Sequence, residues 1–138
     1  MRRILAFCFT IALAYTCHAA DTSFNGGLIV HLGCGDGTQT VALRTAPNCL
    51  VHGLAGKAED VGQARTFVQS KGLYGPVSID LAPGGGKLPY TDELVNLIVV
   101  SDQKLAGKDE IMRVLAPGGV ARIGHKEIVK PWPNDVDE

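Results

Sequence analysis

The sequence has few aromatic residues, no marked excess of either charge and few cysteines. Aromatic residues make up 6% of its 138 residues, and the formal net charge is −1. Because no basic excess or recurring basic cluster is present, we expect no nucleic-acid partner. Charged residues at 20% and hydrophobic residues at 46% instead indicate a globular protein. The length favours a single domain.

A long hydrophobic run occurs at the N-terminus. Met1-Arg2-Arg3 is basic, residues 4–15 are apolar except for Thr10, and small residues stand three and one positions before a cut after Ala19. This layout predicts a signal peptide over residues 1–19. The run is shorter than the ~20 residues that a membrane span needs. We therefore expect an exported mature chain, periplasmic or secreted, without a membrane anchor; a retained N-terminal anchor is the alternative.

Two cysteines, Cys34 and Cys49, remain after such a cleavage. Export would permit a disulfide, but Cys34 follows the carboxyl end of one predicted strand and Cys49 begins the next. In adjacent parallel strands these positions lie a strand length apart, roughly 15 Å, which is beyond bridging distance. No CxxC or histidine–cysteine spacing is typical of a metal site. The sequence therefore predicts neither a disulfide nor a bound metal.

Strand and helix patterns alternate along the rest of the chain. Short apolar runs predict strands, and apolar residues on one helical face predict helices. Strands are expected at 27–32, 49–54, 77–81, 94–100 and 120–123, and helices at 38–45, 57–70 and 108–115. The alternation predicts an α/β fold with a doubly wound, mainly parallel sheet of about five strands in the order 3-2-1-4-5. Residues 20–26 form a short lead, residues 27–124 the domain, and residues 125–138 a tail or linker.

The first predicted strand ends in glycines at alternate positions, Gly33, Gly35 and Gly37. Glycines allow a sharp turn and a close approach of a ligand to the main chain. The helix that follows would direct its free N–H groups towards that ligand. In a doubly wound sheet, ligands bind beyond the carboxyl ends of the strands, where the strand order reverses. The glycine turn is therefore the predicted binding site.

Three segments occur in an informative order. They are G-x-G-x-G at 33–37, Leu88-Pro89-Tyr90-Thr91-Asp92 before the fourth predicted strand, and E-I-M-R-V-L-A-P-G-G at 110–119 before the fifth. Together they resemble class I, Rossmann-like S-adenosylmethionine-dependent methyltransferases of type 11, over residues 27–123. Nicotinamide sites show G-x-G-x-x-G instead, so an NAD-binding module is a more distant alternative.

The resemblance implies a methyltransferase domain that binds S-adenosylmethionine as a small-molecule cofactor. The positions that it assigns to the cofactor are Gly33, Cys34, Gly35, Asp36, Gly37, Ala55 and Asp80. Asp80, at the end of the third predicted strand, would contact the adenine; an exposed structural carboxylate is the alternative. Asp102 is the candidate general base, because it follows the fourth predicted strand at the pocket edge; a structural role is again the alternative.

The sequence departs from this pattern at the ribose. An acid is expected about 20 residues after the glycines to bind the ribose hydroxyls, and Ala55 stands there. Lys57 has the opposite charge, and Glu59 and Asp60 lie inside the predicted helix, where we expect them to face solvent. Two functions follow: a methyltransferase acting on an unidentified acceptor, or a catalytically inactive, methyltransferase-like binding or spacer module of a larger exported protein.

Several further expectations concern packing. His31 and His52 lie in predicted strands, where we expect them to pack or to form hydrogen bonds within the sheet. The fifth predicted strand is expected to be a sheet edge. Residues 129–138 resemble the junction that precedes a quinoprotein-like β-propeller in exported bacterial proteins, which makes such a propeller a possible C-terminal partner domain.

The signal peptide can be tested by expressing the chain with its leader in a host that has a secretory pathway. We expect the exported protein to begin at Ala20, as measured by intact mass and N-terminal sequencing. Ala19→Asp is expected to block cleavage, because the residue before the cut must be small. A full-length, intracellular wild-type product would contradict the prediction.

Overall fold

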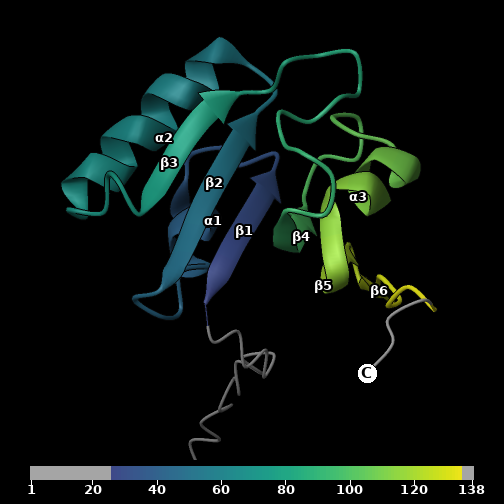
Figure 1. Ribbon diagram of the computed structural model, residues 1–138. Coiled ribbons are helices and arrows are strands. Elements are labelled where there is room, and N and C mark those ends of the chain that lie inside the picture. The colour runs from purple at the N-terminus through teal and green to yellow at the C-terminus, as the bar shows by residue number, and fades with distance from the viewer. Residues whose placement is uncertain (1–25, 135–138) are drawn as a thin grey trace, which may run out of the picture.

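The computed structural model describes residues 26–134 (Figure 1). The predicted signal peptide over residues 1–19 lies outside the described residues. The elements are β1 (Gly27–Leu32), α1 (Thr38–Ala42), β2 (Cys49–Ala55), α2 (Ala58–Ser70), β3 (Val77–Leu81), β4 (Val95–Val100), α3 (Lys108–Val114), β5 (Leu115–Ile123) and β6 (Lys126–Val129).

One sheet organises the fold, with its strands in the order β3-β2-β1-β4-β5-β6. The first five of these strands are parallel, and β6 pairs antiparallel with β5. The predicted α/β class and the predicted order 3-2-1-4-5 are therefore confirmed. The strands β1, β2 and β3 end together at one edge of the sheet (Figure 1), where Leu32 pairs with Leu54.

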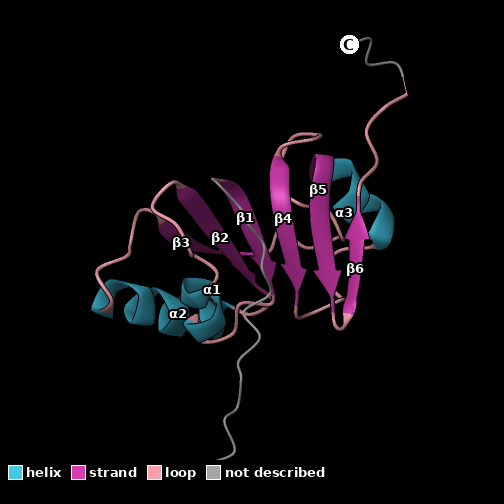
Figure 2. Ribbon diagram, turned by 90° about the horizontal axis from the view of Figure 1, so that it is seen from below, coloured by secondary structure: helices cyan, strands magenta, loops and turns pink. Residues whose placement is uncertain are grey.

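The sheet separates two apolar clusters. Helices α1 and α2 lie on one face of β1, β2 and β3, and α3 lies on the other face (Figure 2). Successive side chains of a strand point to opposite faces, so Ile29 of β1 belongs to the first cluster and Val30 and Leu32 to the second. Burial on both faces explains why β1 is a nearly continuous apolar run.

No helix within residues 26–134 is long and apolar enough to cross a membrane. Over the same residues no group of three or more histidine, cysteine or acidic side chains is arranged to hold a metal ion. Among the described residues, Cys34 and Cys49 are both buried and form no disulfide with each other.

The C-terminal part of the sheet differs from the expectation in two ways. Strand β5 begins at Leu115 rather than Val120, because the Pro-Gly-Gly segment forms an irregularity within it: Val95 pairs with Leu115, and Leu97 pairs with Val120. The expectation that β5 is a sheet edge is wrong, because β6 covers it. The segment 125–138, expected as a tail or linker, thus contributes a strand.

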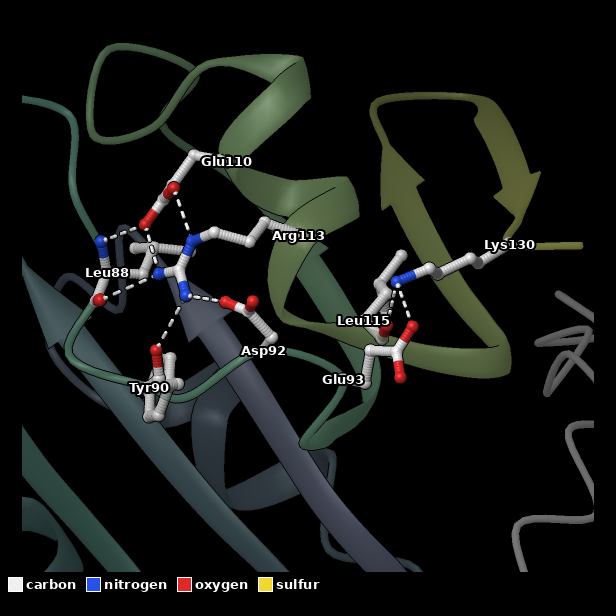
Figure 3. Close-up of polar contacts among 8 residues, drawn as sticks. All are labelled: Leu88, Tyr90, Asp92, Glu93, Glu110, Arg113, Leu115 and Lys130. Atoms are coloured by element: carbon white, nitrogen blue, oxygen red, sulfur yellow. Dashed lines mark hydrogen bonds and ion pairs between the residues drawn. The ribbon is translucent and has the colours of Figure 1, made fainter. Parts of the chain in front are cut away.

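The loop between β3 and β4 is fastened to α3 by an ion-pair cluster (Figure 3). The Arg113 guanidinium donates to both carboxylate oxygens of Glu110, at 2.6 and 2.8 Å, and to Asp92 at 2.6 Å. It also donates to the Tyr90 and Leu88 carbonyls, while Glu110 accepts the Leu88 N–H at 2.8 Å. The L-P-Y-x-D and E-x-x-R segments of the sequence are therefore two halves of one structural clamp.

The hydrogen bonds from Arg113 and from the Leu88 N–H lower the pKa of Glu110 to about 2. A carboxylate whose pKa is lower in the folded than in the unfolded protein stabilises the fold above the unfolded value, near 4.5, and this contribution is lost as the pH falls towards 2. We therefore expect Glu110→Gln to reduce the free energy of unfolding at pH 6 and to flatten its decrease between pH 5 and pH 2.

The pH series is measured by urea unfolding at constant ionic strength. Glu59→Gln is the matched control, because Glu59 is an exposed carboxylate in the first turn of α2. Parallel pH curves for the wild type and Glu110→Gln would show that the clamp does not stabilise the fold.

Candidate cofactor site

A pocket of about 450 Å³ lies at the carboxyl edge of the sheet. Its walls come from the glycine turn after β1, the segment joining β2 to α2, and the segment after β4. The lining residues are Gly33, Gly35, Gly56, Lys57, Asp60, Ser101, Asp102, Lys104 and Leu105. The structure therefore brings the predicted glycine turn and the predicted Asp102 into one site.

The three glycines of the turn serve different steric purposes. A Cβ atom on Gly33 would lie 2.8 Å from the Asp102 nitrogen, and one on Gly37 would lie 3.2 Å from Ala64 of α2. A Cβ atom on Gly35 would meet nothing within 4 Å. Gly33 and Gly37 thus permit close packing of the turn against the protein, whereas Gly35 leaves open space above the pocket.

His31 connects two segments that flank the glycine turn. This residue is 1% exposed, and its Nδ1 and Nε2 atoms form hydrogen bonds with the hydroxyls of Thr40 (2.7 Å) and Ser101 (2.8 Å). Burial lowers the pKa of His31, which keeps the ring neutral, so that one nitrogen donates and the other accepts. The predicted sheet hydrogen bonding of His31 is confirmed, and the contact links α1 to the segment that carries Asp102.

The two residues between the glycines do not line the pocket. Cys34 is buried, and this burial raises the pKa of its thiol to about 11. Asp36 is exposed and accepts the Thr38 N–H at 3.0 Å, a hydrogen bond that lowers its pKa. Asp36 therefore stabilises the start of α1.

The predicted ribose position, Ala55, is fully buried and packs in the cluster between the sheet and α2. Its carbonyl accepts the Ala82 N–H at 2.8 Å. The expectation that both Glu59 and Asp60 face solvent is wrong for Asp60, which is half-buried and lines the pocket. The exposed Lys57 is its neighbour in the wall.

A second, larger pocket of about 600 Å³ lies at the ends of β2 and β3. Its lining is mostly apolar, and its three polar side chains are those of His52, Arg65 and Asp80. The other lining residues are Leu54, Ala58, Val61, Leu81, Pro83 and Pro89. It contains the predicted Asp80. The first turn of α2 borders both pockets, because Ala58 and Val61 line the larger one and Lys57 and Asp60 the smaller one.

Asp80 belongs to a chain of polar contacts that the sequence did not predict. Its carboxylate accepts from Nε2 of His52 at 2.8 Å and from Arg65 at 2.8 Å, and these two partners lower its pKa, His52 most. His52 Nδ1 in turn bonds the Tyr90 hydroxyl at 2.5 Å. Burial raises the pKa of Tyr90, so the phenol stays protonated and donates to His52. The predicted hydrogen bonding of His52 is confirmed.

No family model matches the sequence, and no curated protein matches it. Solved structures do match. An S-adenosylmethionine-dependent methyltransferase from Aquifex aeolicus superposes with a TM-score of 0.61 and 22% identity, covering 70% of this chain and 54% of that one. Geranyl diphosphate methyltransferase in complex with S-adenosylmethionine gives a TM-score of 0.61 at 20% identity, and the match covers 70% of this chain and 40% of that one. The cyclase SpnF gives a TM-score of 0.61 at 22% identity, and the match covers 70% of this chain and 37% of that one.

The chain has the Rossmann-like fold of these S-adenosylmethionine-dependent methyltransferases. It spans between 37% and 54% of the length of the three matched chains. Because one of them is a cyclase, the fold alone does not define the reaction. The function must therefore be argued from the site.

The support under the glycine turn is open to a double-mutant test. His31→Leu leaves the Thr40 hydroxyl, which is fully buried, without its partner and is expected to lower the free energy of unfolding by about 1–3 kcal/mol. Adding Thr40→Val removes the unpaired group and is expected to restore part of this loss. Thermal or urea unfolding of the wild type, the two single variants and the double variant measures the coupling between His31 and Thr40. Strictly additive changes in the free energy of unfolding would contradict this coupling.

Proposed function

We propose that this chain is an S-adenosylmethionine-binding domain of methyltransferase type. The observation that carries the proposal is the glycine turn, whose Gly35 opens onto the pocket while Gly33 and Gly37 hold the turn in place. The fold of the matched methyltransferases supports it. An exported location remains part of the proposal and rests on residues 1–19 alone.

The residues at the two pockets fit the two ends of this cofactor. The smaller pocket is lined by two lysines, Lys57 and Lys104, and by the carboxylate of Asp102, with Asp60 on the side of the larger pocket. A lining with charges of both signs suits the zwitterionic amino-acid end of S-adenosylmethionine. The larger pocket, with its apolar walls and Asp80 at one side, suits the adenine.

When bound, the cofactor supplies an electrophilic methyl group. The protein's contribution is to orient the acceptor in line with that group, because alignment is the main requirement of a direct displacement. Asp102 is the candidate proton acceptor for an acceptor that must lose a proton. Its Oδ1 atom accepts the Lys104 N–H at 2.9 Å, which fixes the carboxylate at the pocket edge.

The second candidate function is a catalytically inactive, methyltransferase-like binding or spacer module of a larger exported protein. The observation that favours it is Ala55, whose buried side chain supplies no hydrogen bond at the expected ribose position. A C-terminal propeller domain as its neighbour in a longer chain is part of this alternative.

Calorimetric titration with S-adenosylmethionine and with its demethylated product, S-adenosylhomocysteine, tests cofactor binding. We expect micromolar dissociation constants for the wild type. Gly35→Arg would fill the open space above the pocket and is expected to weaken binding by at least about tenfold.

Gly72→Arg is the matched control. Gly72 also has a positive φ, +67° against +53° for Gly35, and also has nothing within 4 Å of an added Cβ, but it follows the C-terminal end of α2. We expect Gly72→Arg to bind like the wild type. A folded wild type that gives no heat at millimolar cofactor would overturn the binding proposal and favour the inactive module. Binding without turnover of the cofactor, across a panel of acceptors, would favour that module too.

A further inference from the structure

We propose that Asp60 binds the ribose hydroxyls of the cofactor, in place of the acid that is missing at the end of β2. This inference rests on the proposed function, and it adds a binding residue that the sequence pattern assigns to a different position. It starts from the location of Asp60 between the two pockets.

The first turn of α2 separates the two pockets. Val61 lines the larger pocket, and Asp60, one residue earlier, lines the smaller one. In S-adenosylmethionine the ribose joins the adenine to the amino-acid end. With the adenine in the larger pocket and the amino acid in the smaller one, the ribose would therefore lie beside the first turn of α2.

The orientation of helical side chains favours a contact from Asp60. It is the third residue of α2, and side chains in a helix lean towards its N-terminus. This direction is towards Gly56 and Lys57, which line the smaller pocket together with Asp60. Gly56 has no side chain to obstruct the carboxylate; a Cβ there would lie 3.4 Å from Leu105 and 3.8 Å from Oδ2 of Asp102.

The Asp60 carboxylate is available for a ligand. Among the described residues no hydrogen bond or ion pair engages it, and the N-terminus of α2 has no side-chain cap. Asp102, across the pocket, already accepts the Lys104 N–H. In Asp102 one oxygen, Oδ1, is thus engaged, whereas both oxygens of Asp60 are available for two O–H groups.

The alternatives on the β2 side do not offer the same chemistry. Ala55 is 0% exposed in the apolar cluster, and its carbonyl is used by Ala82. Glu59 is exposed and lines neither pocket. A carboxylate accepts both hydroxyls of a vicinal diol through charge-assisted hydrogen bonds, which are stronger than neutral ones. In this chain the ribose-binding acid would therefore stand in the first turn of α2 and not at the end of β2.

The test compares S-adenosylhomocysteine with its 2′,3′-dideoxy analogue, in titrations of the full chain. The wild type is expected to bind the ribose form at least about tenfold more tightly, since hydrogen bonds to a charged group are stronger than those between neutral groups. Asp60→Asn is expected to weaken binding of the ribose form by about tenfold or more and to leave the dideoxy form nearly unchanged. Glu59→Gln is the matched control and is expected to behave like the wild type.

The outcomes separate the two proposals. If Asp60→Asn retains the wild-type preference for the ribose form, the assignment of Asp60 is overturned while cofactor binding stands. If the folded wild type binds neither compound at millimolar concentration, the proposed function fails and this assignment fails with it. Equal affinities of Asp60→Asn for the two forms, with an unchanged melting temperature, would support Asp60 as the ribose-binding residue.

Discussion

Two positions of the turn after β1, Gly33 and Gly37, leave no room for a side chain, and the arrangement of the site depends on this steric constraint. Gly33 packs against the main chain of Asp102, and Gly37 packs against Ala64 of α2. These two contacts fix the turn between β4 and α2. As a result, Gly35 lies at the surface between segments that arrive from three different strands, and the pocket is defined by backbone as much as by side chains.

Polar clusters hold the segments around this turn. His31 bridges Thr40 and Ser101 beneath it. On the other side, Arg113 and Glu110 fasten the loop that carries Tyr90 (Figure 3). The Tyr90 hydroxyl forms a hydrogen bond with His52, which forms one with Asp80. Because the site is built from loop segments at the ends of strands, its geometry depends on these fixed contacts. The conspicuous E-x-x-R pattern thus shapes the site without touching it.

The sequence predicted most of the strands and the glycine turn that lines the smaller pocket, because apolar runs and glycine turns are local signals. The strand β6 was missed because Lys126-Glu127-Ile128-Val129 is short and half charged. A local signal did exist: Ile123 pairs with Lys126, which leaves a two-residue turn, Gly124-His125, with φ +61° at the glycine. Glycine at the first position of a two-residue turn is typical of a β-hairpin.

The side-chain contacts of the site could not be predicted in the same way. His52, Asp80 and Tyr90 are separated by 28 and 38 residues along the chain, counted from His52, and only the folded sheet brings them together. Asp60 was expected to face solvent because helical periodicity identifies the core face of α2. Periodicity carries no information about a pocket at the end of the helix, where a residue of the first turn leans over the preceding segment.

Arg65 of α2 affects the exposed edge of the sheet at β3. It donates from Nε to the Ile79 carbonyl of β3, the outermost strand on that side of the sheet, at 2.9 Å, while its guanidinium also holds Asp80. Edge strands with open backbone groups are templates for pairing with further strands. Since the Arg65 side chain occupies the Ile79 carbonyl and carries a charge along the edge, this point of β3 is closed to a further strand.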